Sequence, residues 1–191
     1  VIVYDRAKSK SAGFYKKFFL NVPRDPVITG NVAWSPAMEG AVEKGRLFVT
    51  SLLPAGATIQ WKTINDGQPA GGIDSITLRP SNEDMWSQIY VAAPGAPQET
   101  RMLHVIQGTN AGVTSADAAQ VITSSDGEFE GSVVGSKCIV FRKTLNSAPT
   151  GMSYTHPAGM TAHYITGLAP FAGYNIAQTS TSVAVTANGT Q

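Results

Sequence analysis

Histidine is the side chain most often used as a general base near neutral pH, and this sequence contains three: His104, His156 and His163. His104 lies inside an apolar run, so two roles stay open for it: a neutral histidine of the core, or a general base that faces a partner domain. His156 precedes Pro157 at the start of a turn, where we expect it to be exposed. His163 and Tyr164 are neighbours on a predicted strand and therefore point to opposite faces.

The other groups that could do chemistry are poorly arranged for it. A zinc site needs three or four converging ligands, and no short spacing of His, Cys and Asp predicts one. Ser132 follows Gly131 directly, so the Gly-x-Ser-x-Gly nucleophile elbow is absent. Cys138 lies in an apolar strand, as a small buried hydrophobe would. Glu128 and Glu130 share a strand face, which favours a solvated edge over a catalytic pair. The sequence therefore predicts no catalytic residue, no metal and no cofactor.

Aromatic side chains are the better candidates for binding, because sugars stack on flat rings. Trp86 and Tyr90 share one face of a predicted strand, and Ile89 and Val91 lie on the other. This aromatic face could bind a saccharide, or it could pack against another domain. Trp34 lies in a predicted loop with the same two possible roles. With His104, these residues form the predicted carbohydrate or interdomain contacts.

The strand that organises the predicted fold is Arg46–Pro54. Its apolar residues fall on both faces, with Leu47 and Val49 on one and Phe48 on the other, so we expect both faces to be covered. A second such strand covers residues 100–107. Turn residues recur roughly every eight to twelve residues, which is typical of sandwiches. We therefore predict an all-β fold, an antiparallel β-sandwich of about a dozen short strands without substantial helix, forming a single domain over residues 1–191.

Composition limits the possible partners. Charged residues make up 14% of the 191 residues, against about 25% in an average chain. The net charge of +1 argues against nucleic-acid binding, which needs a clustered basic surface. No membrane span is visible in the sequence, and low charge with many Thr, Ser and Gly residues favours a secreted or periplasmic location. Val1 begins directly in a predicted strand, so we expect the chain to be a fragment or the C-terminal part of a longer one.

Several strand sequences together resemble the C-terminal β-sandwich of heparinase II/III-like polysaccharide lyases. The resembling stretches, in chain order, are Val3-Tyr4-Asp5-Arg6, Gly45-Arg46-Leu47-Phe48 with Leu52-Leu53-Pro54, Met102-Leu103-His104-Val105-Ile106-Gln107, Val140-Phe141, and His163 through Tyr174. The stretch from Trp86 to Val91 stands where the family often carries a Trp-Arg-Ile-Glu-Val strand, but it lacks the Arg and the Glu.

The resemblance implies an accessory role. In that family the catalytic Tyr, His and Asn lie on a helical toroid and at its border with the sandwich, and this sequence predicts no such helices. The family's structural zinc site has no matching ligand set here. The implied function is a non-catalytic domain that supports a toroid, from the same precursor or a companion chain, and contacts an acidic polysaccharide. Two alternatives remain: a stand-alone carbohydrate-binding or adhesion module, and a self-sufficient β-sandwich lyase.

Overall fold

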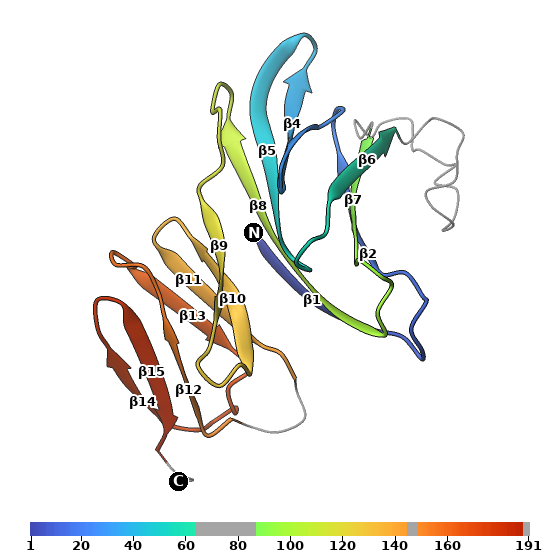
Figure 1. Cartoon of the computed structure of the whole chain (residues 1–191). Coiled ribbons are helices and arrows are strands. Elements are labelled where there is room, and N and C mark those ends of the chain that lie inside the picture. The colour runs from blue at the N-terminus through green and yellow to red at the C-terminus, as the bar shows by residue number, and fades with distance from the viewer. Residues whose placement is uncertain (64–86, 145–148, 189–191) are drawn as a thin grey trace. The chain divides into compact units, whose positions relative to one another are not determined.

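The computed structural model describes residues 1–63, 87–144 and 149–188. These residues form fifteen strands and no helix, mostly in antiparallel pairs (Figure 1). The predicted all-β sandwich class is confirmed. The described part of the chain therefore contains no helix that could cross a membrane. Two strands are longer than predicted, with twelve residues each.

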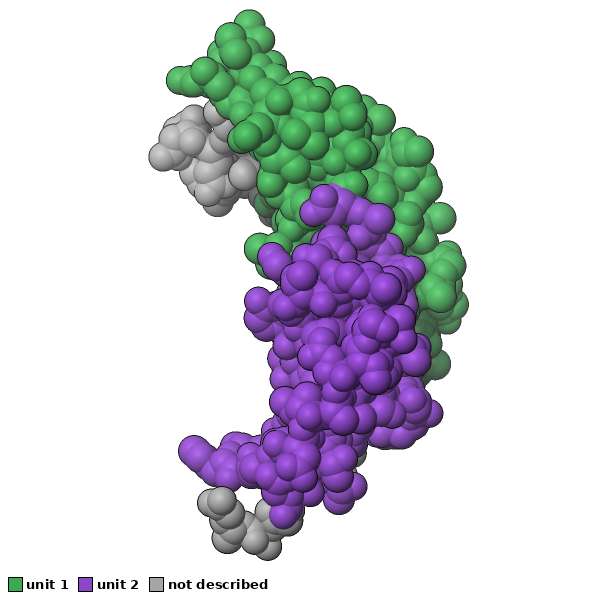
Figure 2. Space-filling model, turned by 90° about the vertical axis from the view of Figure 1, so that its left-hand side faces the viewer, with its two compact units in different colours: residues 1–116 green, residues 117–191 purple. Residues whose placement is uncertain are grey.

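The chain divides into two compact units, residues 1–116 and residues 117–191 (Figure 2). Each unit has its own core. Two expectations stay predictions: that residues 1–191 form a single domain, and that they belong to a longer chain. The strands of unit 1 are β1 (Ile2–Lys8), β2 (Lys17–Val22), β3 (Val27–Thr29), β4 (Val32–Glu39), β5 (Val42–Leu53), β6 (Ile59–Thr63), β7 (Ser87–Ala92) and β8 (Glu99–Asn110). The strands of unit 2 are β9 (Ala119–Thr123), β10 (Phe129–Val134), β11 (Lys137–Arg142), β12 (Gly151–Thr155), β13 (Ala162–Thr166), β14 (Tyr174–Gln178) and β15 (Ser182–Ala187).

Unit 1 is built from a five-stranded sheet, β1-β8-β5-β4-β3, and a three-stranded sheet, β2-β7-β6. Ile89 and Val91 alternate along β7, and both are fully buried against Ala33 and Val49 of the larger sheet. The apolar residues of one strand parity therefore form the core between the two sheets.

The predicted double coverage of the central strands is confirmed. On β5, Val49 is 0% exposed and its neighbour Phe48 is 1% exposed, although neighbouring strand residues point to opposite faces. Leu103 and His104 show the same pattern on β8, with both side chains 0% exposed. The five-stranded sheet is thus covered on both faces at its centre.

The structure corrects the loop predicted around Trp34, which lies in β4. Pro23, Pro26 and Gly30 favour a loop, but all three lie before the strand. Pro36 lies within β4, beyond the part that pairs with β3, so β5 is its only partner among the described strands there. A proline can occupy such a position. It has no N–H to donate, and the side of the strand without a partner requires no hydrogen-bond donor.

Unit 2 combines a four-stranded sheet, β13-β11-β10-β9, with a three-stranded sheet, β12-β15-β14. Phe129 and Val140 of the first sheet form the core with Tyr154 and Val185 of the second. β11 and β13 are the one parallel pair among the strands described. At Gly131 the backbones approach closely, because a Cβ there would lie 1.8 Å from the carbonyl oxygen of Ile139.

Candidate functional site

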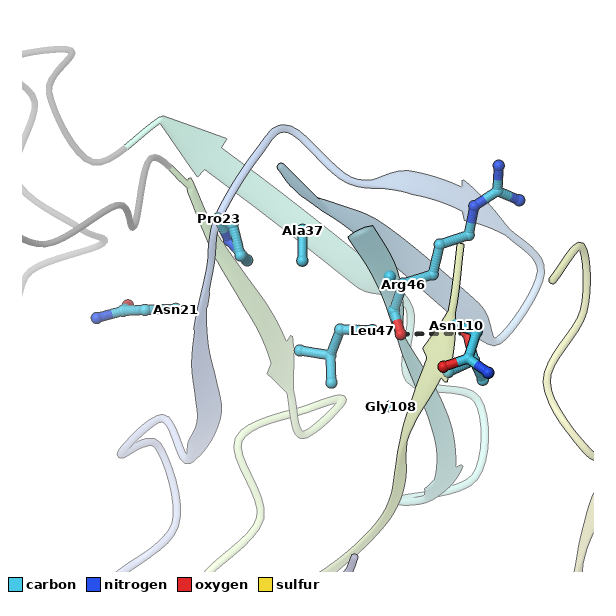
Figure 3. Close-up of a pocket in the computed structure, with 9 residues that line it drawn as sticks. Asn21, Pro23, Ala37, Arg46, Leu47, Gly108 and Asn110 are labelled. Atoms are coloured by element: carbon cyan, nitrogen blue, oxygen red, sulfur yellow. Dashed lines mark hydrogen bonds between the residues drawn. The ribbon is translucent and has the colours of Figure 1, made fainter. Parts of the chain in front are cut away.

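A cavity of about 600 Å³ opens at one end of the unit 1 sandwich (Figure 3). It lies where the end of β2 and the start of β5 meet β4 and the end of β8. The wall includes Asn21, Ala37, Leu47, Gly108, Thr109 and Asn110. Ligand sites in proteins have volumes of about 300–1,000 Å³, so the cavity is large enough for a small saccharide.

The two glycines of the cavity wall have different roles. Gly45 allows β5 to approach β8, since a Cβ there would lie 2.6 Å from the carbonyl oxygen of Thr109. Gly108 has the same strand parity as His104 and Ile106, and a Cβ built on it meets no atom within 4 Å. The absent side chain at Gly108 therefore leaves open space at the end of the sandwich.

Arg46 lines the cavity but does not give it a free charge. Its Nε donates a hydrogen bond to Glu43 Oε1 over 2.7 Å, and its Nη1 donates to the carbonyl oxygen of Val113 over 2.9 Å. The hydrogen bond from Arg46 also lowers the pKa of the Glu43 carboxyl. Figure 3 shows the Arg46 side chain turned away from Leu47, as expected for neighbours on a strand. The hydroxyl of Thr109 donates a hydrogen bond to the carbonyl oxygen of Arg46 over 3.3 Å. The amide of Asn110, which has the same strand parity as Gly108, is a neutral group.

Trp34 lies half-buried on β4 with Arg46 over its ring. The guanidinium carbon is 4.3 Å from the ring centroid, and the ring of Phe48 lies 6.5 Å from it, centroid to centroid. A cation so close to an indole is held by the negative face of the ring. One face of Trp34 is therefore occupied by a neighbour in the same chain.

Tyr90 is half-buried on the outer face of the three-stranded sheet, opposite its core neighbours Ile89 and Val91. The ammonium of Lys17 lies 5.2 Å from its ring centroid, and the ring of Phe19 lies 6.4 Å away. The predicted division of β7 into a core face and an aromatic-polar face is thus correct at these residues. Trp86, the other aromatic residue predicted for this face, lies outside the described residues.

His104 is completely buried between the sheets of unit 1, and its ring stacks on Phe18 of β2 with centroids 3.9 Å apart. Neither ring nitrogen has a hydrogen-bond partner in the described part of the chain. Burial lowers the pKa of His104 to about 4, and the carboxylate of Asp5 offsets part of this effect. The ring is therefore neutral at pH 7.

The described candidates do not converge on one site. Trp34 lies on the face of the large sheet away from the core, Tyr90 lies on the outer face of the small sheet, and His104 lies between the two sheets. Each ring is also covered on one face by a neighbour. Contact of these residues with a saccharide or another domain stays a prediction.

Unit 2 contains a cluster that the sequence did not reveal. The hydroxyl of Tyr154 and Nδ1 of His163 share a hydrogen bond of 2.8 Å, and the rings of His156 and His163 lie 4.7 Å apart, centroid to centroid. His156 was expected to be exposed but is 6% exposed, because the chain after β12 folds its ring against these two side chains. The hydrogen bond joins strands of two different sheets, and no local pattern indicates such a contact.

The surroundings of this cluster favour neutral groups. Burial raises the pKa of the Tyr154 hydroxyl, and the Cys138 thiol adds to this effect. Burial lowers the pKa of His163, and neighbouring His156 lowers it further. Among the described residues, no third His, Cys, Asp or Glu lies with the two histidines in a group that could hold a metal ion. The three side chains pack against one another at the core of unit 2.

No protein-family model matches the chain, and no curated protein matches it by sequence.

Proposed function

We propose that this chain is the accessory β-sandwich of a heparinase II/III-like polysaccharide lyase and supports a catalytic helical toroid. The observation that carries the proposal is the position of three of the stretches that resemble this family. Residues 3–6, 45–48 and 102–107 lie in β1, β5 and β8, which are neighbours at one side of a single sheet. Stretches far apart in the sequence thus form one continuous structural element.

The arrangement of possible catalytic groups agrees with a supporting role. His104, which lies within the family-like stretch of β8, is buried and neutral, so it cannot meet a polymer. Tyr154 is 1% exposed and its pKa is raised, which makes it a poor proton donor and acceptor for a saccharide. Catalysis would then come from the toroid, in the same precursor or in a companion chain, in a secreted or periplasmic enzyme.

A complementation experiment tests this role. The chain is mixed with a heparinase II/III-like catalytic domain from which its own sandwich has been removed, and the ultraviolet absorbance of the unsaturated uronide product is followed. We expect the chain alone to give no product. We expect the mixture to form product faster than the isolated catalytic domain does. A mixture no more active than that domain, without binding between the two, would contradict the proposal.

The cavity of unit 1 favours a second candidate function, a carbohydrate-binding module. Its volume suits a small saccharide, and the neutral amide side chains of Asn21 and Asn110 lie in its wall. Because Arg46 is already paired with Glu43, the cavity suits an uncharged sugar better than an acidic one. Calorimetric titration with neutral and acidic oligosaccharides separates the candidates: binding of a neutral sugar supports the module, and binding of only acidic sugars contradicts this role for the cavity.

A further inference from the structure

The strand β14 is an open edge of unit 2. Among the strands that the structure describes, it pairs with β15 alone, and Figure 1 shows it at the outer margin of its sheet. At the other side of the same sheet, a β-bridge between Ser124 and Tyr154 connects β12 to the chain just after β9. One side of this sandwich is therefore closed by backbone pairing, and the side of β14 is not.

The sequence around β14 lacks the charges that usually protect an edge strand. From Thr144 to Gln191 the chain contains no Asp, Glu, Lys or Arg. The edge strands of unit 1 differ: β1, β2 and β6 each contain at least one charged residue, and β3 has only three residues. Charged side chains and short edges are the common protection against pairing with another chain, and β14 has neither.

The side chains of β14 are also largely exposed. Ile176 at its centre is 69% exposed, and the residues from Asn175 to Gln178 are all exposed. Phe171, in the loop before β14, is fully exposed and has a positive φ of 62°. Non-glycine residues in this backbone region are strained, and such strain gathers at functional sites.

We propose that β14 binds β14 of a second copy of this chain as an added antiparallel strand. A strand without charge meets its own copy without repulsion, and an antiparallel pair related by a two-fold axis uses the same edge on both molecules. Full overlap of the two strands places Ile176 opposite Ile176 of the second copy. The pairing joins the two three-stranded sheets into one continuous sheet.

The other open edge of unit 2, β13, is less suited to this role. His163 of β13 is already bonded to Tyr154, and three of the five residues of β13 are half-buried. A pair of five-residue strands buries less surface than a standard interface, so we expect weak, concentration-dependent association. Sedimentation velocity from about 1 µM to about 1 mM covers the dissociation constants of such complexes.

The test compares the wild type with three variants. We expect the wild type to dimerise and Ile176→Lys to weaken dimerisation about tenfold or more, since two ammonium groups then face each other. Val27→Lys is the matched control, because Val27 is an exposed apolar residue on the edge strand β3 of unit 1. This control should dimerise as the wild type does. Far-UV circular dichroism verifies that each variant is folded.

Mixing two variants makes the test specific for the register. Ile176→Glu alone should also fail to dimerise, but an equimolar mixture of Ile176→Lys and Ile176→Glu should associate, because opposite charges then meet across the strand pair. A wild type that stays monomeric up to the highest concentration overturns the proposal. The candidate partner of this edge would then be a strand of another protein. A dimer that Ile176→Lys does not weaken overturns it as well, by placing the interface elsewhere.

Discussion

The ring of His104 lies nearly parallel to the ring of Phe18, with centroids 3.9 Å apart and planes inclined by 24°. This stack joins β8 of the large sheet to β2 of the small one across the core of unit 1. The stack encloses the imidazole of His104 in the core. Protonation there would create a buried and poorly solvated charge, which is unfavourable. The pair makes the stability of unit 1 sensitive to pH.

We expect unit 1 to lose stability between about pH 6.5 and pH 4. Above the ordinary pKa of 6.5, His104 is neutral in both states; between 6.5 and its folded pKa of about 4, only the unfolded chain takes up the proton. Folding is therefore progressively disfavoured as the pH falls, by on the order of 3 kcal/mol once both pKa values are passed. Urea unfolding at several pH values, followed by tryptophan fluorescence, measures this slope.

The fluorescence reports on the correct unit, because Trp34, Trp61 and Trp86 all belong to residues 1–116. His104→Leu should flatten the slope. The control His163→Gln changes a histidine of unit 2 and should leave the fluorescence slope unchanged. A slope that survives His104→Leu would assign the pH sensitivity to another group.

Leu103→Ala should destabilise unit 1 by about 2–5 kcal/mol, since Leu103 is 0% exposed and its truncation leaves a void at the centre of the sheet. Chemical denaturation followed by tryptophan fluorescence measures the change. Val42→Ala provides the comparison, because Val42 lies on neighbouring β5 but is 58% exposed, and it should cost about 0.5 kcal/mol or less. Equal midpoints for both variants would contradict the assignment of β8 to the core.

Gly131→Ala should strongly destabilise unit 2, because the added methyl group would lie 1.8 Å from the carbonyl oxygen of Ile139. That oxygen belongs to the backbone of β11, so the two strands would have to separate. Gly108→Ala is the control, since its methyl group meets no atom within 4 Å and Gly108 is not among the glycines with positive φ. Thermal unfolding followed by far-UV circular dichroism should show a loss of unit 2 structure in the first variant alone.

Gly108→Leu should block the cavity of unit 1 without unfolding it. The larger side chain would extend into the space beside Leu47 and Asn110 that the glycine leaves open. If a neutral oligosaccharide binds there, its dissociation constant should rise about tenfold or more, while the denaturation midpoint stays near that of the wild type. Unchanged affinity in a folded Gly108→Leu variant would place the sugar outside the cavity.

Residues 1–191 alone should show no lyase activity. β-Elimination from a uronic acid needs a base, an acid and a group that neutralises the carboxylate, all at one sugar ring. The chain is incubated with heparan sulfate, alginate, hyaluronan and chondroitin, and the unsaturated product is followed by ultraviolet absorbance. Turnover in the usual range of about 1–10³ s⁻¹, abolished by His163→Ala, would identify a self-sufficient lyase instead.

The sequence by itself determined the fold class and the central strands. Phe48 and Val49 are neighbours of opposite parity and are both apolar, and this local pattern is enough to predict a strand covered on both faces. The division of β7 into a core face with Ile89 and a polar face with Tyr90 follows from the same alternation of side chains.

Only the tertiary structure decided what surrounds each candidate residue. Arg46 lies over Trp34 because β4 and β5 pair in a particular register, and Tyr154 meets His163 because two sheets pack face to face. The cavity at Gly108 and the open edge at β14 likewise depend on which strands lie side by side. Strand patterns record the direction of each side chain but not its partner, since partners distant in sequence are selected by sheet pairing and packing.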